Sequence, residues 1–146
     1  MAMTLQEIFD KVVVHLHKQN KQSKVGGNSV YTACMYRTPE GLSCAVGCLI
    51  PDGLYTARIE STAVAVADTT GYVPYVEVTQ LLVGAGVIPN SNEQSYLRLL
   101  FELQRLHDGT YQYGFTPQFA TELCKLAEKF DLSTETLDSL TPYEVK

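Results

Sequence analysis

The sequence predicts an α+β fold, a helix-rich single domain over residues 1–146 with a small antiparallel β element around residues 30–50. Two segments at opposite ends of the chain repeat apolar residues at helical spacing. Residues 30–37 are instead rich in β-branched and aromatic side chains and precede a turn. Hydrophobic residues make up 45% of the 146 residues and charged residues 18%, a composition and length that suffice for one core.

The first helix is expected to begin after Thr4. Residues 4–7 (TLQE) fit a capping box, in which the Thr oxygen and the Glu carboxylate satisfy free backbone N–H groups. The apolar residues that follow at helical spacing are Leu5, Ile8, Phe9, Val12, Val13 and Leu16. Residues 21–29 are polar and contain Gly26 and Gly27, which predicts a loop.

The β element is expected to start with a strand over residues 30–37 and a turn over residues 38–41, where Pro39 and Gly41 suit the turn geometry. Residues 42–50 fit either the return strand of a hairpin or a short buried helix, because periodicity does not separate the two in so short a segment. Residues 54–74 carry no clear pattern.

The second half of the chain reads as helical. Residues 76–83 predict a short helix that ends at Gly84 and Gly86. Residues 91–94 (SNEQ) fit a second capping box, and Gly109 is expected to end the helix that follows. The apolar face of that helix consists of Tyr96, Leu99, Leu100, Leu103 and Leu106.

A further helix is expected to begin at Thr116 and Pro117, which suit the cap and the first turn. Its predicted core residues are Phe119, Ala120, Leu123, Cys124, Ala127 and Phe130. Residues 133–140 predict a final short turn of helix.

Charge and hydropathy limit the classes of partner and the cellular compartment that the sequence predicts. The net charge is −5, from 11 Lys and Arg against 16 Asp and Glu, which argues against a nucleic-acid partner because Lys and Arg supply most of that affinity. No apolar run approaches the roughly 20 residues of a membrane helix. The chain opens directly into an amphipathic pattern without a signal peptide. We therefore expect no membrane partner and a cytoplasmic protein with reduced thiols.

The positions of the cysteines suggest a zinc site as one hypothesis. Cys44 and Cys48 share a face on either a helix or a strand, and Cys34 lies across the predicted turn. With His107 or Cys124 as fourth ligand they would form a Cys₃His or Cys₄ site. However, no Cys-x₂-Cys pair is present and the neighbouring residues are core-like. The sequence therefore predicts no metal and no cofactor.

A nucleophilic cysteine is the enzymatic alternative. Cys44 or Cys48 would attack, His107 would act as base, and Asp108 or Asp52 would orient the imidazole. The same His-Asp pair also suits the end of a helix, where free carbonyls and the helix dipole favour such residues. A cysteine-dependent hydrolase or transferase therefore stays as the alternative function.

Tyrosine is the remaining compositional signal, with nine copies and no tryptophan. A tyrosine combines a stacking face with a hydroxyl, and an arginine offers a planar fork of donors to a carboxylate or phosphate. The residues expected to contact a ligand or partner are Tyr36, Arg37, Asp52, Tyr111 and Tyr113.

Residues 34–52 (CMYRTPEGLSCAVGCLIPD) resemble a signature of small uncharacterised proteins from phages and prophages, and residues 103–108 (LQRLHD) fit the same family. The resemblance implies a viral or mobile-element accessory protein in a bacterial cytoplasm, and it supplies no catalytic residue. We expect a non-enzymatic protein that binds a host protein or a small host metabolite or nucleotide signal, with counter-defence as one such role.

Overall fold

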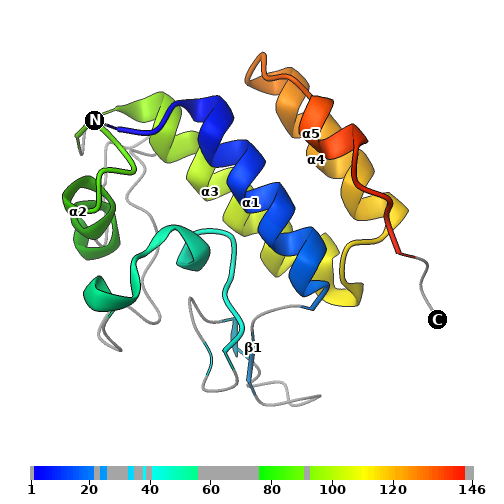
Figure 1. Ribbon diagram of the computed structural model, residues 1–146, viewed down its shortest axis with the longest axis horizontal. Coiled ribbons are helices and arrows are strands. Elements are labelled where there is room, and N and C mark those ends of the chain that lie inside the picture. The colour runs from blue at the N-terminus through cyan, green and yellow to red at the C-terminus, as the bar shows by residue number, and fades with distance from the viewer. Residues whose placement is uncertain are drawn as a thin grey trace, which may run out of the picture.

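The computed structural model describes residues 2–21, 24–25, 33–34, 38, 41–55, 76–90 and 93–143 (Figure 1). The helices are α1 (Leu5–Gln19), α2 (Val76–Gly84), α3 (Gln94–Asp108), α4 (Pro117–Lys129) and α5 (Glu135–Asp138). The described residues also include the short 3₁₀ turns η1 (Gly47–Leu49), η2 (Asp52–Leu54) and η4 (Thr110–Tyr113). Strand β1 (Lys24–Val25) pairs antiparallel with β2 (Ala33–Cys34).

The α+β prediction is wrong, because the described part of the chain is built from helices. Its β ladder consists of two residue pairs, which is too short to form a layer. Residues 42–50 form no continuous return strand, because Ser43 alone occupies a bridge position. From Cys44 onward the backbone bonds are local, such as Cys48 N–H to the Cys44 carbonyl at 3.1 Å, and four consecutive residues, 44–47, are buried without the alternation of a half-buried strand. Most of the strand predicted over residues 30–37 lies outside the described residues.

The predicted capping box of α1 is confirmed. The Thr4 hydroxyl accepts from the Glu7 N–H at 3.0 Å, and the Glu7 carboxylate accepts from the Thr4 N–H at 2.8 Å. The helix ends at Asn20, whose backbone has φ +48° and donates its N–H to the Leu16 carbonyl. These local bonds set the length of the helix that carries one side of the candidate site.

The predicted caps of the other two long helices differ in outcome. The second capping box is wrong, because α3 begins at Gln94 after Glu93, which makes no side-chain cap bond, and Ser91 lies outside the described residues. The end at Gly109 is confirmed. For α4 the prediction is confirmed: the Thr116 hydroxyl accepts from the Phe119 N–H at 3.2 Å, and Pro117 occupies the first turn.

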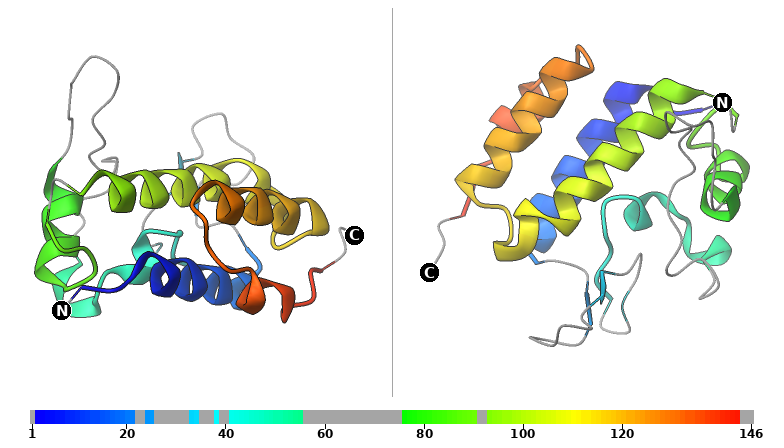
Figure 2. Two further views of the ribbon diagram at one scale, coloured as in Figure 1. Left: turned by 90° about the horizontal axis from the view of Figure 1, so that it is seen from above. Right: turned by 180° about the vertical axis from the view of Figure 1, so that it is seen from behind.

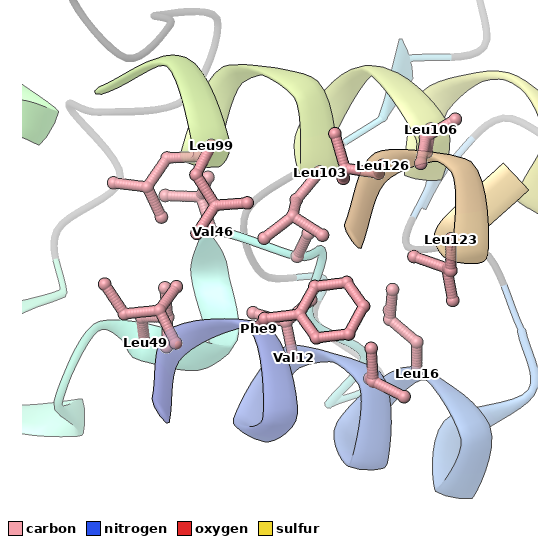
Figure 3. Packing of buried hydrophobic residues seen from close by; sticks show 14 of the residues in the cluster. Phe9, Val12, Leu16, Val46, Leu49, Leu99, Leu103, Leu106, Leu123 and Leu126 are labelled. Atoms are coloured by element: carbon pink, nitrogen blue, oxygen red, sulfur yellow. The ribbon is translucent and has the colours of Figure 1, made fainter. Parts of the chain in front are cut away.

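The helices form two layers (Figure 2), with α1 and α5 in one and α3 and α4 in the other. Helices α1 and α3 run in the same direction, and α4 returns antiparallel to α3 (Figure 1). Figure 3 shows the core between the layers, where Phe9 and Val12 of α1 point toward Leu103 of α3. Val46 and Leu49 fill the end of this core, so burial of their side chains fixes the segment before and within η1 against the helices.

In the part of the chain that the structure describes, no helix has both the length and the apolar character needed to cross a membrane.

Candidate functional site

A cavity of about 530 Å³ lies between α1 and the segment of residues 41–52. Its lining includes His15, Thr38, Ser43, Cys48, Ile50 and Asp52. The volume falls within the range of small-molecule sites, which usually combine apolar walls with a few placed polar groups. Helix α1 contributes the imidazole, and residues between 38 and 52 contribute the remaining lining.

Helix α1 holds the wall of this cavity at Ser43. The Gln19 side-chain oxygen accepts from the Ser43 N–H at 2.9 Å, and its Nε2 donates to the Ser43 carbonyl at 2.9 Å. His15 Nε2 lies 3.0 Å from the same carbonyl. Because a carbonyl only accepts, Nε2 carries the proton in this bond. Two side chains one helical turn apart therefore fix one backbone unit of the wall.

Helix α3 holds the same segment three residues further along. The Gln104 side-chain oxygen accepts from the Val46 N–H at 3.2 Å, and its Nε2 donates to Asp108 Oδ1 at 2.9 Å. That oxygen also lies 2.8 Å from His107 Nδ1. The segment that forms the cavity wall is thus anchored to α1 and α3, and such hydrogen bonds hold it in place although it forms no long helix or strand.

The imidazole of the cavity is held in its neutral form. Burial lowers the pKa of His15, the bond to Ser43 opposes that shift, and electrostatic interactions with His107 and Lys11 add to it. At neutral pH, His15 therefore contributes a hydrogen-bonding ring and no charge to the cavity.

The turn predicted over residues 38–41, which contributes to the cavity lining, is confirmed. The Gly41 N–H donates to the Thr38 carbonyl at 3.0 Å, and the Thr38 hydroxyl accepts from the Leu42 N–H at 3.1 Å. Gly41 has φ +93°, a conformation that suits glycine. Tyr36 and Arg37, which directly precede Thr38 in the chain, lie outside the described residues.

The candidate cysteines occupy different environments. Cys44 is completely buried, its sulfur accepts from the Gly47 N–H at 3.2 Å, and burial raises its pKa well above the ordinary value. Cys48 is partly buried, lines the cavity, and donates its thiol to the Ala45 carbonyl at 3.1 Å. The side chain of Cys34 lies outside the described residues. Among the side chains that are described, no three His, Cys, Asp or Glu residues form a metal-binding group.

The structure does not give the predicted nucleophile and base a shared opening to solvent. His107 is completely buried and packs on the Tyr111 ring at 5.3 Å between centroids, and Cys44 is buried as well. A substrate in solvent reaches neither side chain. Cys48 does reach the cavity, where the imidazole in the lining is His15.

Two tyrosines that the sequence predicts to contact a ligand or partner, Tyr111 and Tyr113, lie in different environments. Tyr111 belongs to the core, where its hydroxyl donates to the Leu16 carbonyl at 2.6 Å and accepts from the Lys21 N–H at 2.9 Å. Both bonds are internal, so Tyr111 supports α1 and contacts no ligand in this arrangement. Tyr113 is 68% exposed. Asp52 is exposed and lies in the cavity lining.

Sequence reasoning missed the residues that build the wall, namely His15, Gln19 and Gln104. A signal for the first two was present, since polar residues four apart on an otherwise apolar-faced helix lie on one side of it. No protein-family model, curated protein or solved structure matches this chain.

Proposed function

We propose that this chain is a phage-type accessory protein that binds a small host metabolite or nucleotide signal, without converting it, in the cavity between α1 and residues 41–52. The observation that carries the proposal is a cavity of about 530 Å³ whose wall is hydrogen-bonded to two helices. A wall fixed before binding loses little conformational freedom when a ligand enters, which favours affinity.

The lining supports a polar ligand with an apolar part. The ring of His15 and the side chains of Ser43 and Asp52 offer hydrogen-bonding groups, whereas Ile50 offers an apolar surface. Such a mixture suits a heterocycle or a nucleoside, which has polar edges and a flat apolar face. Sequestration of a signal of this kind is the counter-defence role that the resemblance to phage proteins suggests.

Binding without conversion is favoured over catalysis by the state of the thiols. Burial raises the Cys44 pKa, so this sulfur stays a thiol, and a thiol is a poor nucleophile. The Cys48 thiol is engaged as a donor to the Ala45 carbonyl. Neither observation provides the ionised sulfur beside a general base that a cysteine hydrolase requires.

The proposal is tested by retention of a ligand from a defined pool. Purified protein is incubated with a bacterial metabolite extract and separated from unbound compounds by gel filtration. The protein is then denatured, and the masses of the released small molecules are measured by mass spectrometry. We expect one compound to be retained near one equivalent per chain and to have the same mass as in the extract.

A matched pair of variants links the retained compound to the cavity. Cys48→Leu places a larger side chain in the cavity lining, whereas Cys124→Leu makes the same change at a partly buried position on α4. Retention should fall at least about tenfold in the first variant and stay unchanged in the second. Equal retention by both variants, or no retained compound in the unmodified protein, would refute the cavity as the site. A compound of altered mass would favour the cysteine-dependent alternative at Cys48.

A further inference from the structure

A second hollow lies between α3 and α4, which run side by side in the layer opposite α1 and α5 (Figure 2). Its volume is about 170 Å³, and Leu106 and Leu126 form its apolar part. The charged residues in its lining are Glu102, Arg105, Glu122, Lys125 and Lys129. We refer to these seven residues as the α3–α4 groove.

The charges of the α3–α4 groove are arranged by depth. The Glu102 carboxylate accepts a hydrogen bond from Arg105 Nη2 at 2.8 Å and lies 3.8 Å from Lys129 Nζ. One carboxylate therefore interacts with cations of both helices. Its side chain is only 18% exposed, whereas those of Arg105 and Lys129 are 61% and 64% exposed. The carboxylate therefore lies low in the groove and the two cations stand above it.

The other ion pair repeats this arrangement. Lys125 Nζ lies 3.3 Å from Glu122, and the lysine side chain is 67% exposed against 32% for the glutamate. Exposed ion pairs of this kind stabilise the fold only slightly, so a cation in such a pair can bind another anion at little cost. Solvent thus meets three cationic ends, although the chain as a whole carries a net charge of −5.

An exposed aromatic residue adjoins the cations. Phe101 is 42% exposed and lies one helical turn before Arg105 on α3. Arg98 lies one turn before Phe101 and is close enough to Glu102 to lower its pKa through its charge, an effect smaller than that of the Arg105 hydrogen bond. The outer face of α3 therefore offers an apolar anchor between two guanidinium groups.

We propose that the α3–α4 groove docks an acidic segment of a partner protein, with carboxylates on Arg105, Lys125 and Lys129 and an apolar side chain on Phe101. This interaction is independent of the small-molecule cavity, because the two linings share no residue. Charge complementarity identifies the partner, because three exposed cations in a small groove match a few carboxylates on one short segment.

A protein segment is favoured over a nucleic acid by two features. A long polyanion is repelled by the net charge of −5, whereas a short acidic segment meets mainly the local charge of the groove. The Phe101 ring also stands apart from the hollow as a single anchor, which matches an apolar residue beside a cluster of Asp and Glu.

The experiment is an affinity selection from a random 12-residue peptide library on the immobilised full chain. The groove variant is Lys125→Glu combined with Lys129→Glu, and the matched control is Lys11→Glu combined with Lys18→Glu, two exposed lysines of α1. Circular dichroism establishes that both variants fold. A fluorescent 20-nucleotide single strand is titrated in parallel as the competing class of ligand.

We expect the unmodified chain and the α1 variant to enrich peptides that carry several Asp or Glu residues and an apolar residue. The groove variant should bind the enriched peptides at least about tenfold more weakly, because two attractive contacts become repulsive. Enrichment without an acidic bias, equal peptide binding by the groove variant, or selective oligonucleotide binding at the groove would overturn the proposal.

Discussion

The side-chain amide of Gln19 pairs with both backbone polar groups of Ser43, accepting from its N–H and donating to its carbonyl, each at 2.9 Å. This is the pairing that a neighbouring strand would offer, and here it comes from the last residue of α1. It explains how the wall of the cavity stays in place although residues 42–46 form no helix and no continuous strand.

Removal of this amide should loosen the wall. Gln19→Ala deletes both bonds to Ser43 and a third to the Lys21 carbonyl, and we expect it to lower the free energy of unfolding by about 1–2 kcal/mol. Urea denaturation measures the loss, and hydrogen exchange of the Ser43 amide locates it. If the Ser43 amide exchanges as slowly in Gln19→Ala as in the unmodified protein, the two hydrogen bonds from Gln19 do not hold the cavity wall in place.

The alkylation rates of the thiols should differ. Burial raises the pKa of Cys44 and closes it to solvent, whereas Cys48 borders the cavity. Under native conditions we expect iodoacetamide to modify Cys48 well before Cys44, and to modify Cys44 only after addition of urea. Both cysteines lie in one tryptic peptide between Arg37 and Arg58, so fragment-ion mass spectrometry distinguishes them. Modification of Cys44 at the rate of Cys48 would contradict this order.

The histidine of the cavity should make stability depend on pH. Burial lowers its folded-state pKa below the ordinary 6.5, so the unfolded chain binds a proton at this residue more readily than the folded one. The contribution of His15 to stability is therefore complete above about pH 6.5, falls as the pH is lowered through that value, and levels off below the folded-state pKa. His15→Gln should remove this part of the pH dependence.

Proton NMR titration of the histidine ring measures the same shift directly. The midpoint assigned to His15 by comparison with His15→Gln should lie below 6.5. A midpoint at or above that value would mean that the imidazole is not buried as described.

The elements that sequence analysis predicted correctly are those fixed by neighbouring residues. The cap of α1 joins Thr4 to Glu7, and the cap of α4 joins Thr116 to Phe119. Local pattern does not decide the conformation of residues 42–50, because two of their backbone N–H groups are bonded by side chains that are distant in the chain. Ser43 is held by a residue 24 positions away, and Val46 by one 58 positions away. No local pattern contains that information, so the choice between strand and helix stayed open.

The candidate site was predicted in part for the same reason. Cys48 and Asp52 were singled out by chemical type, and both lie in the cavity lining. His15 joins them only because α1 packs against their segment. The sequence gives no reason to distinguish Tyr111 from Tyr113 as ligand contacts. Both belong to η4, yet the Tyr111 ring is buried in the core and the Tyr113 ring is exposed. Burial of a given ring is decided by tertiary packing, which composition does not specify.

Gly114 should be intolerant of a side chain. It has φ +87°, and a Cβ atom there would lie 2.4 Å from the Asn20 side-chain oxygen, which accepts from the Phe115 N–H at 2.7 Å. Gly114→Ala therefore combines backbone strain with the loss of a bond that joins α1 to the start of α4, and we expect it to cost about 2–4 kcal/mol of stability. Gly53→Ala is the matched control, since a Cβ there meets no atom within 4 Å. Thermal unfolding of both variants tests the difference, and equal midpoints would show that the Asn20 contact does not constrain this turn.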